Sequence, residues 1–146
     1  MARVGLLEDN ARIAKLCATM LQFAGHSVTT YEHPRECLDA LMLPTAKMNG
    51  KSQSYHSSLF SVSSALPIEV LILDLQLPEI SGIEVLQLLQ SHPQTRALPL
   101  IFCTASSPSE VACALRIAPH ASVIEKPFKL QALASVVLKA LNSSEV

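Results

Sequence analysis

The sequence predicts an α/β fold, in which helices cover both faces of a sheet of parallel strands. Strand-like and helix-like segments alternate five times along the chain, the order expected for βαβ units. The four apolar residues from Val70 to Leu73 also run without interruption up to Asp74, as in a strand buried on both faces of a parallel sheet. Right-handed crossovers would bring the carboxyl ends of all five strands to one edge, where open α/β sheets bind ligands.

The length and composition favour one folded domain, spanning residues 1–146. The 146 residues are 49% hydrophobic and only 16% charged, which excludes disorder for most of the chain. A net charge of -1 gives no general attraction to nucleic acid or anionic membranes. No apolar run approaches the roughly 18 residues of a membrane span, and the N-terminus begins a strand rather than a signal peptide. We therefore expect a cytoplasmic protein without direct contacts to nucleic acid or membrane.

The four cysteines are widely spaced and form no CxxC pair: Cys17, Cys37, Cys103 and Cys113. This spacing favours small core residues in a reducing compartment over zinc ligands or disulfides.

The first half of the chain predicts two strand–helix pairs. The strand from Arg3 to Leu7 stops at two adjacent acids, and Asn10 can cap the helix that follows. Gly25 suits the position just after that helix. A second strand is expected at 27–31, and Pro34 suits the start of a second helix. Apolar residues recur at helical spacing in both helices: Ile13, Leu16, Cys17, Met20 and Leu21, then Cys37, Leu38, Leu41 and Met42.

From about Leu43 to Pro67 the periodicity fails. Seven of the thirteen residues from Ser52 to Ser64 are serine, and a loop of this length is uncommon inside a compact domain. We expect a mobile, serine-rich surface insertion at about 43–67, in which Leu59, Phe60 and Val62 could make a brief contact or a short strand. A regulatory or partner-binding role is the alternative, and nothing in its residues selects it.

The second half predicts three more strand–helix pairs. After Asp74, the segment 81–84 has capping-box spacing and begins a helix that should end before Pro93. The fourth strand is expected at 100–103, and residues 104–106 follow it and end it. Ser107 and Pro108 then provide a strong helix start. A fifth short strand, 122–124, precedes the last helix, whose apolar side is formed by Leu130, Leu133, Val136, Val137 and Leu141.

Polar residues follow four of these strands. Glu8 and Asp9 follow the first strand, Asp74 the third, Thr104 the fourth and Lys126, with Pro127, the fifth. Each has an ordinary structural explanation alone, such as an acidic pair at a helix start, a turn aspartate or a solvated lysine. In this order, each at a strand end, they resemble the receiver domain of two-component response regulators. The resemblance covers nearly the whole chain apart from the insertion, and implies a flavodoxin-like three-layer sandwich with strand order 2-1-3-4-5.

The acids suggest a magnesium site. Crowded carboxylates repel one another, and a hard divalent cation with oxygen ligands relieves that repulsion. Asp9 and Asp74 are expected as direct Mg²⁺ ligands, with Glu8 holding a metal-bound water. The resemblance implies the backbone carbonyl of Gln76 as a further ligand.

The resemblance also implies a phosphoacceptor role for Asp74. Its carboxylate would take a phosphoryl group from a phosphohistidine of a sensor histidine kinase or phosphotransfer protein. Lys126 and the Thr104 hydroxyl would contact the phosphoryl oxygens, and a downstream effector would bind the phosphorylated state. The chain would thus be a signalling switch rather than an enzyme. The Lys126–Pro127 bond is expected to be cis.

Two positions depart from the usual receiver pattern. Val123 stands where receivers carry an aromatic residue on the fifth strand, which puts the usual readout in doubt while leaving the phosphorylation chemistry untouched. Glu8 replaces the commoner aspartate and should be tolerated if it acts through water. Ala105 leaves room for phosphate access, and Ser106 is expected to affect how fast the acyl phosphate hydrolyses.

Three alternatives stay open. A degenerate receiver would bind partners without phosphorylation; the intact acids, Thr104 and Lys126 argue against it, whereas Val123 and the insertion argue mildly for it. A phosphohydrolase with an aspartyl nucleophile would need a second acid where Gln76 stands. The chain could also be a stand-alone receiver, slightly favoured by Met1, or one domain of a longer protein. Exposed apolar residues on the last two helices could support docking or a homodimer.

Overall fold

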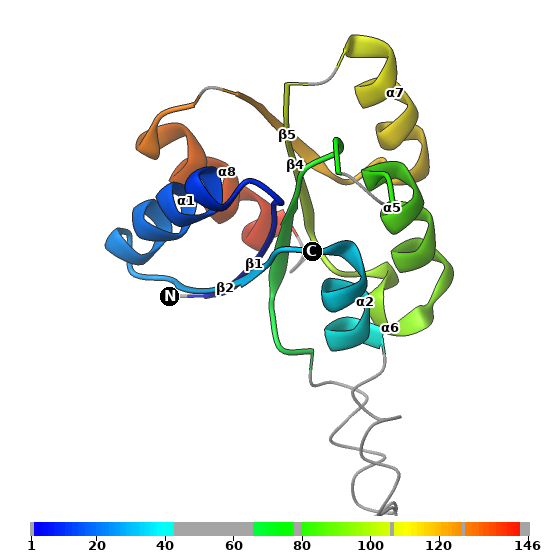
Figure 1. Ribbon diagram of the computed structural model, residues 1–146, viewed down its shortest axis with the longest axis horizontal. Helices are drawn as coiled ribbons and strands as arrows, with labels where there is room; N and C mark the ends of the chain where they lie inside the picture. Colours follow the sequence, from blue (N-terminus) through cyan, green and yellow to red (C-terminus); the bar gives the residue numbers. More distant parts are fainter. Residues whose placement is uncertain (1, 43–65, 78–79, 106, 127, 144–146) are drawn as a thin grey trace, which may run out of the picture.

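Five parallel strands form one sheet of order β2-β1-β3-β4-β5, so the predicted fold class and strand order are confirmed (Figure 1). The computed structural model describes residues 2–42, 66–77, 80–105, 107–126 and 128–143. The strands are β1 (Arg3–Leu7), β2 (Ser27–Tyr31), β3 (Val70–Leu73), β4 (Leu100–Thr104) and β5 (Ser122–Glu125). The helices are α1 (Ala11–Phe23), α2 (Pro34–Met42), α5 (Gly82–Ser91), α6 (Pro93–Arg96), α7 (Pro108–Ile117) and α8 (Leu130–Ser143).

The sheet is the middle of three layers, with α1 and α8 on one face and α2, α5 and α7 on the other (Figure 1). Successive strand residues point to opposite faces, so β3 contributes to two apolar clusters. Leu71 and Leu73 pack with α2 and α5, whereas Val70 and Ile72 pack with α1 and α8. All four residues of β3 are fully buried, as their continuous apolar run predicts.

The helix starts follow the predicted caps. The Asn10 side chain accepts hydrogen bonds from the backbone N–H groups of Arg12 and Ile13. Ser81 and Glu84 form both hydrogen bonds of a capping box, and Ser107 accepts from the Glu110 N–H. These side chains satisfy N–H groups that have no partner within the helix. Gly25, with φ of 100°, follows α1 in the left-handed conformation that glycine tolerates.

The short helix α6 was not predicted. The helix α5 ends at Ser91, as Pro93 requires, but Pro93 itself begins another turn of helix. Thr95 stabilises this corner, because its fully buried hydroxyl donates a hydrogen bond of 2.6 Å to the Leu89 carbonyl near the end of α5. A four-residue helix shows no periodicity in the sequence, and contacts such as that of Thr95 become visible only in the folded structure.

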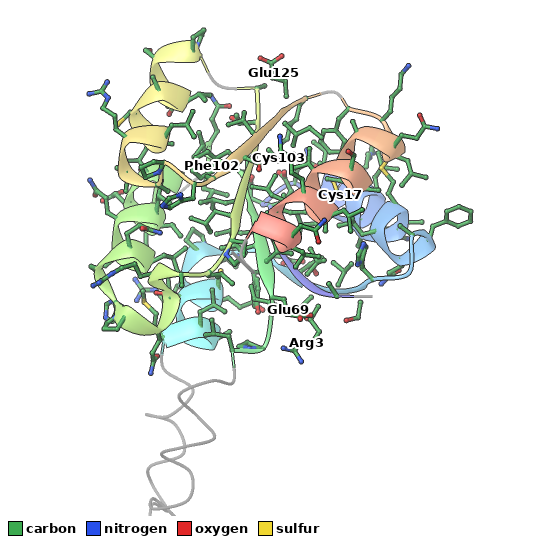
Figure 2. All side chains as sticks on the ribbon, turned by 180° about the vertical axis from the view of Figure 1, so that it is seen from behind. Arg3, Cys17, Glu69, Phe102, Cys103 and Glu125 are labelled. Carbon is green, nitrogen blue, oxygen red and sulfur yellow. The ribbon has the colours of Figure 1, made fainter. Side chains whose placement is uncertain are left out.

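The predicted core position is confirmed for three of the four cysteines. All four cysteines are free thiols; Cys17, Cys37 and Cys103 are buried in the core and Cys113 is half-buried. Figure 2 shows Cys17 and Cys103 among the side chains between the sheet and the α1/α8 layer.

The surface of the last two helices agrees with its prediction in part. Apolar residues were expected to be exposed on both helices, but on α7 the larger ones, Val111, Leu115 and Ile117, are half-buried against the core. Only α8 carries an exposed one, Leu138. In the described part of the chain, the other large apolar side chains that are exposed are Leu16 and Phe23 on α1 and Leu88 on α5.

Several predictions concern residues outside the described ranges. They are the serine-rich part of the insertion at 43–65, with Leu59, Phe60 and Val62, the role of Ser106 and the Lys126–Pro127 bond. Within the described ranges, no helix is long and apolar enough to cross a membrane.

Candidate functional site

Three of the predicted site residues come directly after a strand, and each is held by one further backbone hydrogen bond to the neighbouring strand. The Glu8 N–H donates to the Tyr31 carbonyl of β2, and the Asp74 N–H donates to the Leu7 carbonyl of β1. The Lys126 N–H donates to the Thr104 carbonyl of β4. Because the strands are parallel, these added bonds place all three side chains at the same edge of the sheet.

Lys126 joins the two buried acids. Its Nζ lies 2.9 Å from Glu8 Oε1 and 3.0 Å from Asp74 Oδ2. Both carboxylates are almost completely buried, with 3% and 7% of their side-chain surfaces exposed, while Lys126 keeps 17%. Buried charges are stable only when they are paired and hydrogen-bonded, and this bridge provides both.

Backbone N–H groups hold the other carboxylate oxygens. Asp74 Oδ1 accepts from the Gln76 N–H at 2.9 Å, and Glu8 Oε2 accepts from the Asn10 N–H at 3.3 Å. Each acid therefore has one oxygen directed at Lys126 and one held by the loop that follows its strand. These two loop contacts, which sequence patterns did not reveal, restrict the rotamers of both acids.

Gly82 allows the loop after Asp74 to pack closely on the start of α5. A Cβ at this position would lie 2.5 Å from Leu75 Cα and 2.7 Å from the Asp74 carbonyl oxygen. Real Cβ atoms do not approach backbone this closely, so only glycine fits without moving the loop. The Gly82 N–H also donates to the Leu75 carbonyl at 3.0 Å. The sequence suggested a helix start here, but not this close approach.

The third acid, Asp9, completes a carboxylate cluster. One oxygen from each of Glu8, Asp9 and Asp74 can be chosen so that all three lie within 4.8 Å of one another. Asp9 is exposed, in contrast to the other two acids, so the cluster opens to solvent on its side. Three carboxylates near one ammonium leave an excess of negative charge. Hard oxygen donors at this spacing suit Mg²⁺, so the residues present fit the cation that was predicted.

The electrostatics agree with two acids sharing one lysine. Burial raises the pKa of Glu8, and the Asp74 charge adds to the increase, although the hydrogen bond from Lys126 opposes it. Burial by itself would lower the pKa of Lys126, but hydrogen bonds to Glu8 and Asp74 outweigh it, so that this pKa is raised. Lys126 therefore stays charged at neutral pH, while the charged form of Glu8 is disfavoured.

Thr104 and Val123 belong to β4 and β5, the two strands that lead to Lys126 and its hydrogen-bond partner Thr104. Thr104 is the last residue of β4 and is 1% exposed, and the following Ala105 is exposed. Val123 pairs with Phe102 in the sheet and is half-buried against the same core cluster as Val111 of α7. Val123 is therefore a packed strand residue, as the sequence allowed.

A half-buried lysine that bridges two buried acids, at the carboxyl edge of a 2-1-3-4-5 parallel sheet, is an arrangement that defines a receiver-type α/β domain. Comparison with known families agrees, because the response regulator receiver domain family matches residues 4–138. The chain belongs to this family.

Solved structures give the same fold. A receiver domain of a signal transduction histidine kinase from Syntrophus aciditrophicus is 23% identical with a TM-score of 0.70, covering 98% of this chain and 92% of that one. The chemotaxis protein CheY4 of Vibrio cholerae is 23% identical with a TM-score of 0.71, covering 97% and 99%. At these identities the likeness concerns the fold.

Among curated proteins, the chain is similar to protein RcaC of Microchaete diplosiphon. The two are 27% identical over 100 residues, which is 68% of this chain and 12% of that protein. The chain therefore spans about an eighth of the length of this relative.

Proposed function

We propose that this receiver domain takes a phosphoryl group onto Asp74 and thereby switches the binding of a partner. The donor would be a phosphohistidine of a sensor histidine kinase or of a phosphotransfer protein, and the reader a downstream effector. One observation carries the proposal: Lys126 Nζ bridges Asp74 and Glu8, with Asp9 beside them. A nucleophilic carboxylate next to a fixed ammonium is suited to accept a group that carries negative charge.

The proposed step is a transfer between nitrogen and oxygen. An Asp74 carboxylate oxygen forms a bond to phosphorus as the bond from phosphorus to the donor imidazole breaks. The electron pair of that bond goes to the imidazole nitrogen. The donor leaves as neutral imidazole, directly if its other ring nitrogen carries a proton and otherwise after the ring takes up a proton from solvent. The Gln76 N–H, 2.9 Å from Oδ1, holds the attacking side chain in place. After the transfer, the Lys126 ammonium would contact the oxygens of the phosphoryl group on Asp74.

Mg²⁺ is the proposed cofactor, held by Asp9 and Asp74 directly, by the Gln76 carbonyl, and by Glu8 through water. When bound, the cation would neutralise negative charge on the phosphoryl oxygens. The Thr104 hydroxyl is proposed to donate to the phosphoryl group at the end of β4. Since Val123 lacks an aromatic ring, the proposed readout depends on movement of the loop after Thr104 rather than on a ring.

We further propose that the protein works in the cytoplasm and turns over no free substrate as an enzyme. Binding of the effector would follow a shift between two states of the domain, because a ligand or modification can favour only the state with which it interacts better.

The decisive test is the intact mass after incubation with acetyl phosphate and Mg²⁺. We expect the wild type to gain one phosphoryl group, and Asp74→Ala and Asp74→Asn to gain none. Asp39→Asn on α2 is the matched control and should behave as wild type. If neither acetyl phosphate nor a phosphorylated histidine phosphotransfer domain modifies the wild type, the proposal is wrong and the domain binds partners without phosphorylation. Sustained turnover of p-nitrophenyl phosphate would instead indicate a phosphohydrolase.

A further inference from the structure

A second concave site lies at the opposite edge of the sheet from Asp74. It is a groove of about 730 Å³ at the amino ends of β4 and β5. Its walls come from α6 and the segment that leads into β4 on one side, and from the turn before β5 on the other, and Ala140 of α8 also lines it. In Figure 1 this region lies near α6, away from the strand ends that carry the acids.

The base of the groove is apolar and reaches the core. Leu98, Leu100, Ala118 and Ala140 line it and are each between 4% and 6% exposed. The first three belong to the cluster under α2, α5 and α7, and Ala140 belongs to the cluster under α1 and α8. The groove therefore lies where both core clusters reach the edge of the sheet. A cavity of this size is in the range that holds small organic ligands, roughly 300 to 1,000 Å³.

The two walls are held by backbone and side-chain hydrogen bonds. The Leu98 N–H donates to the Thr95 carbonyl, and the buried Thr95 hydroxyl fixes this corner to α5. On the other side, the Ala121 N–H donates to the Ala118 carbonyl and closes the turn before β5. A groove with fixed walls loses little conformational freedom when a ligand binds.

Apart from the amide of Gln90, the polar side chains that line the groove are basic. Arg96 lines it, and its Nε donates to the Gln90 carbonyl at 3.2 Å, which orients the guanidinium. His120 lines the opposite wall. None of the described residues that line the groove is an aspartate or a glutamate. An apolar base with a basic rim is complementary to a molecule that has an apolar body and one anionic group.

We propose that this groove binds a small amphipathic carboxylate, with its apolar body over Leu98 and Leu100 and its carboxylate at Arg96 and His120. The site is separate from the carboxylate cluster, and the proposal does not depend on phosphorylation of Asp74.

The test uses 2-naphthylacetate as the probe and its neutral isostere, 2-naphthylacetamide, as the matched ligand. Binding is followed by ¹H–¹⁵N correlation spectra of the whole chain. For a ligand of this size we expect a dissociation constant on the order of 1 mM, with the largest shifts at residues 96–100 and 118–121. The acetamide should bind at least about fivefold more weakly, because it lacks the charge that Arg96 pairs with.

Two variants and one control complete the test. Arg96→Gln should weaken 2-naphthylacetate about fivefold and leave 2-naphthylacetamide unchanged. Ala97→Leu, at an exposed position in the groove wall, should weaken both probes by filling the space. Arg116→Gln, an exposed arginine of α7 outside the groove, should change neither. Equal binding of the two probes, shifts centred on Leu16 and Phe23 instead, or no shifts at all would overturn the proposal.

Discussion

Lys126 Nζ lies 2.9 Å from Glu8 Oε1 and so joins residues that are 118 positions apart in the sequence. The same nitrogen lies 3.0 Å from Asp74 Oδ2. The ends of β1, β3 and β5 are thus connected through one ammonium group, although β1 and β5 are not neighbours in the sheet. The stability of this edge and its affinity for cations should therefore depend on one side chain.

Replacing that side chain should have opposite effects on stability and on cation binding. In Lys126→Met, Glu8 and Asp74 lose their cationic partner, and we expect a loss of about 1 to 2 kcal/mol in the free energy of unfolding without Mg²⁺, less than for a fully buried pair because Lys126 is partly exposed. Mg²⁺ should bind about threefold to tenfold more tightly, because a competing positive charge is gone. Urea unfolding and calorimetric titration measure the two effects.

Lys139→Met, at an exposed position of α8, is the control for the lysine variant and should alter neither quantity. Weaker Mg²⁺ binding in Lys126→Met would mean that the lysine organises the acids for the cation instead of competing with it.

The raised pKa of Glu8 predicts a pH dependence of stability in the metal-free protein. A carboxyl group with a raised pKa in the folded state stabilises that state below its ordinary pKa of 4.5, and this contribution is lost as the pH rises through the raised value. The free energy of unfolding of the wild type should therefore decrease relative to that of Glu8→Gln as the pH increases from 4.5.

Urea unfolding in EDTA at several pH values between 4.5 and 7.5 measures this difference. Glu32→Gln, an exposed acid before α2, should show no such trend. A difference that does not vary with pH would indicate that Glu8 titrates as it does in the unfolded chain.

The close approach at Gly82 predicts a strong effect of a single methyl group. In Gly82→Ala the new Cβ meets the backbone of Leu75, which cannot move as a side chain can. We expect a loss of about 2 to 3 kcal/mol in stability. Phosphorylation by acetyl phosphate should also slow, because the Asp74 carbonyl lies 2.7 Å from the same Cβ position.

Gly25→Ala separates the two effects. No atom lies within 4 Å of a Cβ at Gly25, so the cost there is the left-handed backbone alone, about 1 kcal/mol, with normal phosphorylation. Similar losses of stability in Gly82→Ala and Gly25→Ala would show that the loop between Asp74 and α5 can move to accommodate a Cβ more easily than its close packing implies.

The cysteines should differ sharply in reactivity. Burial raises the pKa of Cys17 to about 11 and the pKa values of Cys37 and Cys103 to about 12, so these thiols hold almost no thiolate at pH 8. Cys113 is half-buried. Iodoacetamide should add one group to the native protein and four in 8 M urea, as measured by intact mass. Cys113→Ala should gain none while folded; fast addition of a second group to the native wild type would contradict the burial of the other three.

The elements and the site positions could be read from local patterns. The apolar run before Asp74, the caps at Asn10, Ser81 and Ser107, and the polar residues at four strand ends are consequences of backbone geometry over a few residues. The strand order was taken from the family resemblance, because the residues of β1 and its surroundings do not indicate that β3 rather than β4 pairs with it.

The sequence by itself determined which side chains stand at the carboxyl ends of the strands, because strand ends follow from short-range hydrophobic patterns and the strand–helix alternation predicts parallel strands. Only the tertiary structure decided the contacts at those ends: that Lys126 bridges Glu8 and Asp74, that Gly82 must lack a Cβ, and that Thr95 supports a short helix. The physical reason is that such contacts depend on distances between segments distant in sequence, to within about an ångström. Those distances arise only when the whole core has packed.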